Sequence, residues 1–297
     1  MNLKEARKQF VKYLEELGRA NSTLIAYSKD IEQLANFMEK NGITDPNDVS
    51  LEDLEDFMEH FAEKGYTNKT ISRKTNSTKT FFSFLDTKRY VSDDPASRLE
   101  HPEVKVSPPR ILSALEYRAL RDVARGDLRT YALIEVFLQT GISISEIAGI
   151  KLAHLHMDTE KTASTEGKDP YLYIPARGSK NERTVPLNEI AQAAIKRYID
   201  EGREDQESEF LFITRTGNPM LVRNIRSTIN RYFEKADIDD ATVNDLRHTF
   251  IAQQLKNDVS LAYVSKVVGH KRVSTTERYL EYAGVEESGQ KVELVTL

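Results

Sequence analysis

The amino-acid sequence predicts a mainly α-helical protein of two domains, the second of which also holds a small antiparallel β-sheet. Three observations support this prediction. Apolar residues recur with the helical period through most of the 297 residues, one proline-rich stretch interrupts them, and only a few short stretches have the composition of strands. With 39% hydrophobic and 30% charged residues, the composition is that of a soluble globular protein and excludes a disordered or membrane-spanning chain.

The composition also narrows the location and the chemistry. The chain contains no cysteine, which excludes disulfides and thiolate metal sites and is compatible with a reducing cytoplasm. The N-terminus has no apolar segment of the kind found in secretory signals, so we expect a cytoplasmic protein.

The charges are unevenly distributed along the chain. The net charge of −5 argues mildly against a nucleic-acid partner, but residues 64–89 carry seven basic residues against one acid, and residues 215–231 carry four arginines and no acid. One basic run alone is typical of a solvated helix face. Two runs, one in each half, favour a nucleic-acid clamp, because phosphate contacts depend on the charge of one face and not on the net charge.

Four helices are predicted in the first domain, residues 1–100. The first helix ends at Gly18, and capping residues at 21–23 open the second. A capping box at Ser50 starts the third helix, and the fourth spans about residues 68–88. No strand pattern competes, so this domain is predicted to be an all-α bundle.

Residues 101–110 hold three prolines and no helical period, so they are predicted to be an extended linker. Residues 111–297 form the second domain. Two strands are predicted there at 171–175 and 183–187 around a polar turn, and a third short strand at 210–214. The other predicted elements are helices, which start with a capping box at Ser113 and continue at 128–139, from 143, and at 188–199, 222–236, 243–256, 260–268 and 274–282.

Residues 244–282 contain the residue types of a phosphate site with a nucleophile. Arg247 precedes His248, His270 follows a glycine, and Tyr279 lies nine positions further on. Charge-assisted hydrogen bonds from arginine and histidine are strongest to anionic oxygens. Tyrosine is among the side chains that form covalent intermediates, so Tyr279 beside such a clamp is a candidate to attack a phosphate.

Four motifs of the second domain resemble those of the tyrosine recombinases, the lambda-integrase and Xer group. They are T-G-x-x-x-S-E from Thr140, R-x-V-P-L from Arg183, D-L-R-H-T-F from Asp245 and G-H-x-x-x-S-T-T-x-x-Y from Gly269. The first domain resembles the family's SAM-like core-binding domain, through T-x-x-x-Y from Thr23, the helix of Arg73 and its F-F-S-F-L end. The resemblance spans nearly the whole chain. It implies the tyrosine-recombinase fold, with a core-binding domain at 1–100 and a catalytic domain with a C-terminal tail at 111–297.

The resemblance implies a site-specific recombinase or integrase that cleaves and rejoins DNA strands through a 3′-phosphotyrosyl intermediate, without a metal or cofactor. By position Tyr279 is the nucleophile, Arg247 holds the non-bridging phosphate oxygens, and His270 hydrogen-bonds the scissile phosphate. The alternatives at these positions are a core aromatic, a plain salt bridge and a structural histidine. His248 is expected to buttress the site, and Tyr282 is expected to be the packing residue on the helix of Tyr279.

Two positions depart from the family pattern. Ser143 stands where the family has its first arginine, and serine cannot supply a guanidinium. Losing one such donor costs about 3 kcal/mol of transition-state stabilisation. Locally Ser143 is expected to be a helix N-cap paired with Glu146. Asn244 stands where the family usually has histidine, and asparagine can hydrogen-bond a phosphate oxygen but cannot shuttle a proton near neutral pH.

The family's general-acid lysine lies in the turn between the two strands, where counting back from Arg183 reaches Gly178 in this chain. Lys180 and Arg177 are the candidates for its role, and Arg177 is also a candidate to replace the charge missing at Ser143. For both, the alternative is a turn that merely touches the DNA backbone. The expected DNA contacts are Arg177, Arg183, Arg73, Lys74, Lys69, Lys79, Arg223, Arg226 and His248.

The implied partners are double-stranded DNA with paired recombination sites and further copies of this chain. A tetramer on DNA is expected, with the apolar C-terminal tail exchanged between protomers, no membrane partner and a place at the nucleoid. The first function hypothesis is an active recombinase, favoured by the intact motif that ends in Tyr279. The second is a recombinase-derived DNA-binding or synapsis protein with weak or no cleavage, favoured by Ser143 and Asn244. A third is a helical protein-interaction module.

Overall fold

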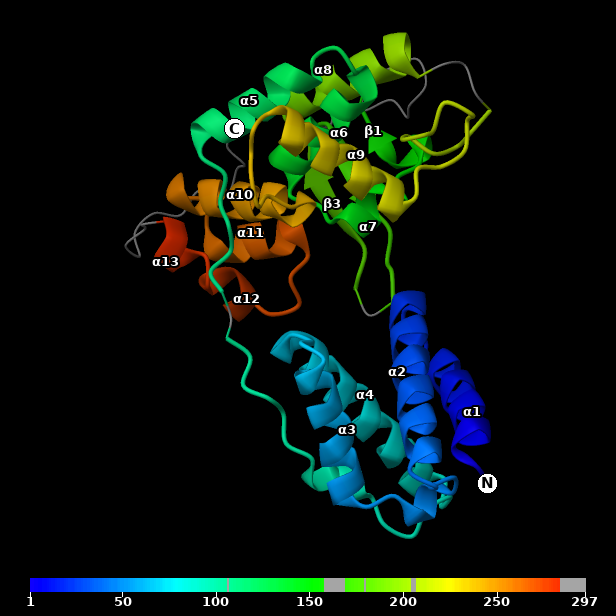
Figure 1. Ribbon diagram of the computed structural model, residues 1–297. Helices are drawn as coiled ribbons and strands as arrows, with labels where there is room; N and C mark the ends of the chain where they lie inside the picture. The colour runs from blue at the N-terminus through cyan, green and yellow to red at the C-terminus, as the bar shows by residue number, and fades with distance from the viewer. Residues whose placement is uncertain (106, 158–168, 179, 204–206, 284–297) are drawn as a thin grey trace. The chain divides into compact units, whose positions relative to one another are not determined.

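The structure is a computed structural model that describes residues 1–105, 107–157, 169–178, 180–203 and 207–283. The chain divides into two compact units, Met1–Ser107 and Pro108–Leu297, and the division lies within the proline-rich stretch. The first unit is helical, and the second combines helices with a three-stranded antiparallel sheet (Figure 1). The predicted mainly α fold class is therefore confirmed.

Four helices build the first unit: α1 (Leu3–Glu16), α2 (Asn21–Lys40), α3 (Leu51–Glu63) and α4 (Asn68–Thr87), with 3-10 turns at Pro46–Asp48 and Pro95–Arg98. Their apolar faces meet in a core rich in phenylalanine, where Phe10 and Phe81 pack edge to face with ring centroids 5.3 Å apart. Ser50 caps α3 as predicted. The predicted cap of α2 is wrong, because Asn21 already lies in the helix and Ala20 before it has no side-chain oxygen.

Lys74 of α4 lies in the interior of the first unit, with 1% of its surface exposed. Its ammonium donates to Asp30 Oδ1 at 3.1 Å and lies 4.0 Å from the centre of the Phe61 ring. The buried Asp30 carboxylate, which also accepts from Ser77 Oγ at 3.0 Å, requires such a cation, because an unpaired buried charge is strongly destabilising. The prediction that Lys74 contacts DNA is therefore wrong, since this lysine neutralises a carboxylate inside the bundle.

The other basic residues predicted on α4 reach the surface to different degrees. Lys69 is exposed. Arg73 pairs with Asp30 while 42% of its side chain stays exposed. Lys79 is half-buried and donates to the Ser97 carbonyl at 2.9 Å. One basic run thus divides between the core and the surface of the unit.

The second unit is built around α6 (Leu128–Thr140), in which every residue from Ala132 to Thr140 is buried. The buried helix predicted at 128–139 is therefore confirmed. Helices α5, α8, α9 and α10 pack against it. The surrounding elements are α5 (Ala114–Ala124), α7 (Ile144–Ile147), α8 (Glu189–Arg197), α9 (Val222–Lys235), α10 (Val243–Lys256) and α11 (Leu261–Val268), with short turns η3 (Leu152–His154) and η4 (Tyr198–Gly202).

The sheet consists of β1 (Leu155–His156), β2 (Tyr171–Ile174) and β3 (Arg183–Pro186), in that order and antiparallel. Strands β2 and β3 are the two predicted ones, and their residues Leu172 and Val185 pair and are buried. β1 has two residues, too few to show a strand pattern. The predicted strand at 210–214 is wrong, because the chain turns back at once and forms single bridges there.

The predicted helix at 274–282 is broken in two, α12 (Ser274–Glu277) and α13 (Leu280–Ala283), and Tyr279 lies at the break. Tyr279 is 9% exposed and Tyr282 is 41% exposed. The prediction that Tyr282 is the packing residue is therefore wrong, and Tyr279 packs against the core instead. The C-terminal tail, which we expected to be exchanged between protomers, lies outside the described residues.

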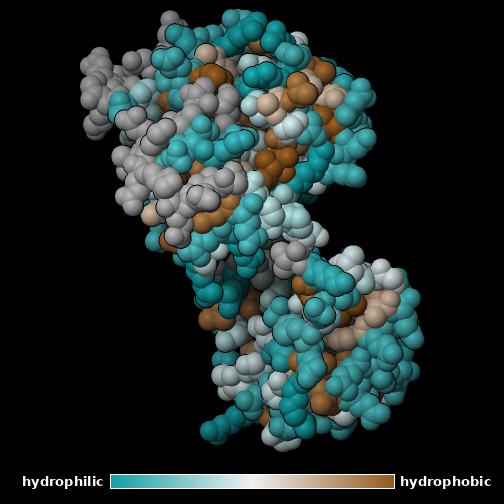
Figure 2. Space-filling view, turned by 90° about the vertical axis from the view of Figure 1, so that its left-hand side faces the viewer, coloured by the Kyte–Doolittle hydropathy of each residue, from teal (hydrophilic) through white to brown (hydrophobic). Residues whose placement is uncertain are grey.

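Hydrophilic residues cover most of the face shown in Figure 2, and hydrophobic residues form separate small groups on it. Among the largest exposed apolar side chains, Ile25 belongs to the first unit and Leu115 to the second. Within the part of the chain that the structure describes, no helix has the length and apolar character needed to span a membrane.

Candidate active site

Helix α10 presents three polar side chains on one face. Asn244, Arg247 and His248 are spaced by three and four residues, which places them on the same side of a helix. The first turn is fixed by Thr242, whose N–H and hydroxyl donate to Asp245 Oδ2 at 2.7 and 2.8 Å. This cap leaves Asn244 exposed and Arg247 and His248 half-buried.

Arg247 ties together the ends of two helices. Its Nη1 donates to the Gly141 carbonyl at the end of α6, and its Nη2 donates to the Val268 carbonyl at the end of α11 at 2.9 Å. Both helices end in a left-handed glycine, Gly141 and Gly269, with φ of 60° and 73°. Burial lowers the pKa of Arg247, and the nearby carboxylate of Glu146 acts in the opposite direction. The guanidinium remains a cation at neutral pH.

Arg183 and Ser143 both bond to Glu146. Ser143 N–H, at the start of α7, donates to Glu146 Oε2 at 2.7 Å. Arg183 holds the same carboxylate with Nη1 to Oε1 at 2.9 Å and Nη2 to Oε2 at 3.1 Å, and its Nε donates to the Val267 carbonyl at 2.7 Å. Only 8% of the Arg183 side chain is exposed. The prediction of a direct DNA contact by Arg183 is therefore wrong, because its guanidinium is held by protein groups below the surface.

The Glu146 carboxyl group is ionised at neutral pH. Burial alone raises its pKa, but the hydrogen bonds from Arg183 and from the Ser143 N–H outweigh burial and lower the pKa to about 2. The predicted pairing of Ser143 with Glu146 at the start of α7 is confirmed. Ser143 therefore suits its backbone position although it lacks the charge of an arginine.

The turn between β2 and β3 brings Arg177 and Lys180 to the same helix, α7. The two residues exchange backbone hydrogen bonds of 3.0 and 3.1 Å across the turn, and Gly178 between them has φ of 57°. Arg177 Nη1 donates to the Ser145 carbonyl at 2.8 Å. Lys180 Nζ lies 3.7 Å from Glu146 Oε1, with 42% of its side chain exposed. Both candidate cations therefore lie beside the helix that begins after Ser143.

His270 follows the left-handed glycine that ends α11. Its Nδ1 lies 2.8 Å from the hydroxyl of Thr276 on α12. Burial lowers the pKa of His270, and the positive charges of Arg247, Lys180 and Arg183 lower it further, to about 4. The imidazole is therefore neutral at neutral pH.

Tyr279 lies near two histidine rings. The centre of its ring is 5.9 Å from that of His248 and 6.5 Å from that of His270. Burial raises the pKa of Tyr279, while the positive charges of Arg247 and Arg278 act in the opposite direction. The Tyr279 hydroxyl is therefore protonated at neutral pH, and the cations Arg247 and Arg278 lie close to it.

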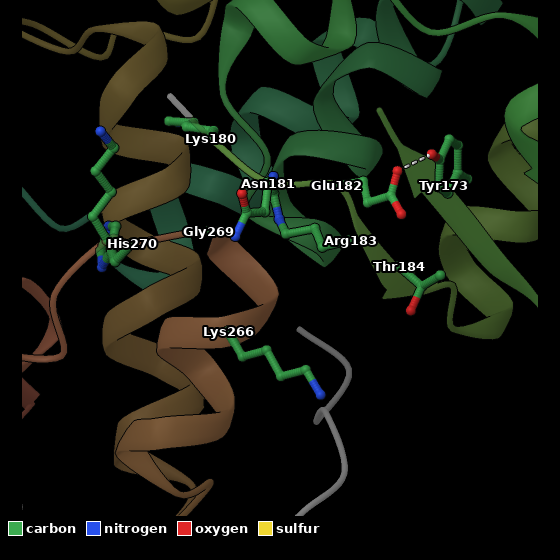
Figure 3. Close-up of a pocket in the computed structure, with 10 residues that line it drawn as sticks. Tyr173, Lys180, Asn181, Glu182, Arg183, Thr184, Lys266, Gly269 and His270 are labelled. Atoms are coloured by element: carbon green, nitrogen blue, oxygen red, sulfur yellow. Dashed lines mark hydrogen bonds between the residues drawn. The ribbon is translucent and has the colours of Figure 1, made fainter. Parts of the chain in front are cut away.

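A cavity of about 740 Å³ opens beside His270, between the β2–β3 hairpin and the end of α11. Figure 3 shows Lys180, Asn181 and Arg183 on the hairpin side and Gly269 and His270 on the other. At the far end, the Tyr173 hydroxyl donates to Glu182 Oε2 at 2.7 Å. Three lysines line this hollow, Lys180, Lys266 and Lys271. They outnumber the carboxylate of Glu182 and make the hollow suited to an anion.

The structure thus gathers most of the predicted site residues, and adds two that sequence reasoning missed. Asp245 bonds to His248 at 3.1 Å, and Thr276 bonds to His270. The spacing of three residues on a helix was a signal for the first pair, whereas a turn separates the second pair and leaves no such signal. The predicted contacts Arg223 and Arg226 lie apart from this cluster in the sequence and are exposed on α9.

Comparison with known sequences covers both units. The Phage integrase family matches residues 108–284, and the N-terminal SAM-like domain of phage integrases matches residues 8–88. Tyrosine recombinase XerC of Listeria welshimeri is 30% identical over 284 residues, which are 92% of this chain and 91% of that protein. Tyrosine recombinase XerC of Bacillus subtilis is 27% identical over 292 residues, 94% of this chain and 92% of that protein.

Solved structures share the fold. A lambda integrase dimer bound to a COC′ core site matches with a TM-score of 0.73 and 14% identity, over 99% of this chain and 81% of that one. The Tn1549 transposon integrase in complex with circular intermediate DNA matches with a TM-score of 0.70 and 20% identity, over 94% and 95%. Since the sequence matches extend over both units, the chain belongs to the phage integrase family and is a Xer-like tyrosine recombinase.

Proposed function

We propose that the protein is a site-specific DNA recombinase that cleaves and rejoins strands through a 3′-phosphotyrosyl intermediate. The observation that carries this proposal is the meeting of Tyr279, Arg247 and His270, which come from three separate segments, with a cationic hollow beside His270. A nucleophile, a fixed cation and a neutral hydrogen-bond donor in one place suit phosphoryl transfer, which depends on positioning and on charge stabilisation.

In the proposed reaction, Tyr279 Oη forms a bond to phosphorus and the bond from phosphorus to the 5′ oxygen breaks. Arg247 uses the N–H groups that its two carbonyl partners leave over to bind the non-bridging oxygens. In the tautomer whose Nδ1 accepts the Thr276 hydroxyl proton, His270 presents Nε2–H to the phosphate.

Lys180 is the proposed general acid for the leaving 5′ oxygen. Lysine can release a proton in a site of this kind, whereas the guanidinium of arginine does not deprotonate in proteins. Arg177 is then the proposed replacement for the arginine missing at Ser143. The hydrogen bond from Arg177 to the carbonyl of Ser145, two residues from Ser143, supports this role.

The proposed partner is double-stranded DNA with paired recombination sites, on which four protomers assemble. A lambda integrase tetramer bound to a Holliday junction shares this fold, with a TM-score of 0.71. The proposed contacts to the DNA backbone are the surface cations of both units: Lys69, Arg73 and Lys79 in the first, and Arg177, Arg223 and Arg226 in the second.

A second candidate function is binding and synapsis of DNA with weak or no cleavage. Two observations favour it, the serine at 143 and the exposed asparagine at 244 in place of a proton-transferring histidine. A nicked suicide substrate that carries the protein's own site separates the two functions. A covalent adduct that forms with the wild type and is lost in Tyr279→Phe supports the recombinase; tight binding without an adduct supports the second function.

A further inference from the structure

The proposed cleavage requires that Tyr279 lose its phenolic proton, and the histidine that could accept this proton in the family is missing. Asn244 stands at the family's histidine position, and an amide cannot accept a proton near neutral pH. His270 is committed to Thr276 and lies among Arg247, Lys180 and Arg183, which makes it a poor base. A base for Tyr279 has to come from elsewhere.

The remaining histidine whose ring lies near that of Tyr279 is His248. Its ring centre lies 5.9 Å from that of Tyr279, with the ring planes at 55°, and Tyr279 itself is nearly buried. The imidazole is held by Asp245, whose Oδ1 lies 3.1 Å from Nδ1. Asp245 is in turn fixed by the N–H and hydroxyl of Thr242 at 2.7 and 2.8 Å. A carboxylate that orients an imidazole toward a hydroxyl nucleophile is the arrangement that activates nucleophiles in unrelated enzymes.

We propose that His248, oriented by Asp245, accepts the proton of Tyr279 when the tyrosine attacks the scissile phosphate. This inference rests on the proposed recombinase function. The O–H bond of Tyr279 breaks as an N–H bond forms at His248 Nε2, and the Nδ1–H of the resulting imidazolium donates to the Asp245 carboxylate. The phenolate oxygen forms the bond to phosphorus, and the displaced 5′ oxygen takes its proton from Lys180.

The charges around His248 favour this transfer. Within the part of the chain that the structure describes, the titratable groups close to the imidazole are Asp245 on its own helix, Tyr279 after α12 and His270 after α11. Asp245 is an anion, because its hydrogen bonds from His248 and Thr242 outweigh the effect of burial on its pKa and lower it. The Asp245 carboxylate can accept a hydrogen bond from His248 Nδ1, and the positive charge of Arg247 favours the phenolate of Tyr279.

The test is single-turnover adduct formation on the nicked substrate by His248→Gln. Glutamine keeps a polar group near the position of Nε2 but cannot accept a proton near neutral pH. We expect a loss of about a hundredfold or more in rate, the usual contribution of a general base. DNA affinity should stay within about threefold of the wild type, because His248 acts on Tyr279 and not on the phosphate. His156→Gln on β1, an imidazole stacked on Tyr171 in the same unit, is the matched control and should cleave at the wild-type rate.

A second measurement separates a base from a packing residue. A ring-fluorinated tyrosine is a stronger acid than tyrosine. In place of Tyr279, it should raise the rate of the His248→Gln variant at least tenfold and change the rate of the wild type little. An unchanged rate in His248→Gln, or a loss that the fluorinated tyrosine leaves in place, overturns the inference while the recombinase function stands. A wild type that forms no adduct overturns the proposed function and this inference with it.

Discussion

Arg183 and Glu146 form a bidentate ion pair below the surface of the second unit, with N–O distances of 2.9 and 3.1 Å and 8% and 7% of their side chains exposed. The pair joins β3 to the first turn of α7. Through Arg183 Nε and the Val267 carbonyl it also reaches the end of α11, which carries His270. The scaffold of the site therefore depends on one buried charge pair, in which the Glu146 carboxylate neutralises the Arg183 guanidinium.

Glu146→Gln should lower the free energy of unfolding by about 3–5 kcal/mol, because it leaves the Arg183 charge buried and unpaired. Urea unfolding of the wild type and the variant measures this change. The matched control is Glu201→Gln, which breaks an exposed pair with Arg197 and should cost less than about 1 kcal/mol. A double variant with methionine at 146 and 183 should recover most of the loss, and additive losses would contradict the coupling.

The contribution of Glu146 should depend on pH. Its pKa of about 2 lies below the ordinary value of 4.5, so its stabilising effect is complete above pH 4.5 and is lost as the pH falls toward 2. The difference in unfolding free energy between wild type and Glu146→Gln should therefore shrink as the pH falls through this window. A difference that stays constant down to pH 2 would show that the carboxylate is not the group responsible.

His270 should make the protein less stable in weak acid. Its pKa of about 4 lies below the ordinary 6.5, so the unfolded chain binds this proton more readily than the folded one. Stability should then fall as the pH is lowered from 6.5 to 4, and His270→Gln should flatten that part of the curve. An NMR titration of the His270 ring should also show its pKa rising when DNA binds, since a phosphate nearby favours the cation.

Arg177→Ala should slow adduct formation by about a hundredfold if Arg177 supplies the charge missing at Ser143. Adding Ser143→Arg to this variant should restore most of the rate, because it returns a guanidinium to the start of α7. Single-turnover assays at saturating protein measure both. Arg177→Ala with the wild-type rate would count against the compensation, and a loss that Ser143→Arg does not repair would do the same.

Lys180→Ala should lose cleavage of ordinary DNA and keep cleavage of a substrate whose 5′ bridging oxygen is replaced by sulfur. A thiolate leaves without a proton, so that substrate needs no general acid. The comparison of the two substrates in wild type, Lys180→Ala and Arg177→Ala assigns the acid. Recovery of Arg177→Ala instead of Lys180→Ala on the sulfur substrate would transfer the role to Arg177.

Gly269→Ala should destabilise the second unit and misplace His270. The added Cβ would lie 2.8 Å from Arg183 Cζ, and the backbone has φ of 73°, which costs about 1–3 kcal/mol for other residues. Gly178→Ala is the matched control, because its φ is 57° and nothing lies within 4 Å of the new Cβ. Urea unfolding should show a larger loss for Gly269→Ala, and equal losses would mean that Arg183 moves aside freely.

Much of the fold could be read from local signals. Capping boxes at Ser50 and Ser113 predicted the starts of two helices, because a capping box is a pattern of two residues three positions apart in the sequence. The break at Tyr279 could not be predicted, since residues 274–282 hold no glycine or proline that would mark the end of a helix. Lys74 was misread for the same reason: its partner Asp30 lies 44 residues away, and a run of basic residues does not tell which of them faces inward.

The candidate site divides in the same way. Fixed motif spacing indicated Tyr279, Arg247 and His270 together with the departure at Ser143, all of which are properties of the sequence itself. The partner of Arg183 could not be predicted, because Glu146 lies 37 residues earlier and the pairing depends on how β3 meets α7.

Arg247 serves two purposes, since the guanidinium proposed to hold the phosphate also binds the carbonyls that end α6 and α11. Selection for a folded protein alone would then keep this arginine, even in a lineage that no longer cut DNA. Ser143 and Asn244 carry no comparable cross-link between helices, so these positions can drift as soon as catalysis ceases to matter. In relatives of this chain, an arginine at position 247 indicates that the fold is kept, whereas the residues at positions 143 and 244 indicate whether DNA cleavage is kept.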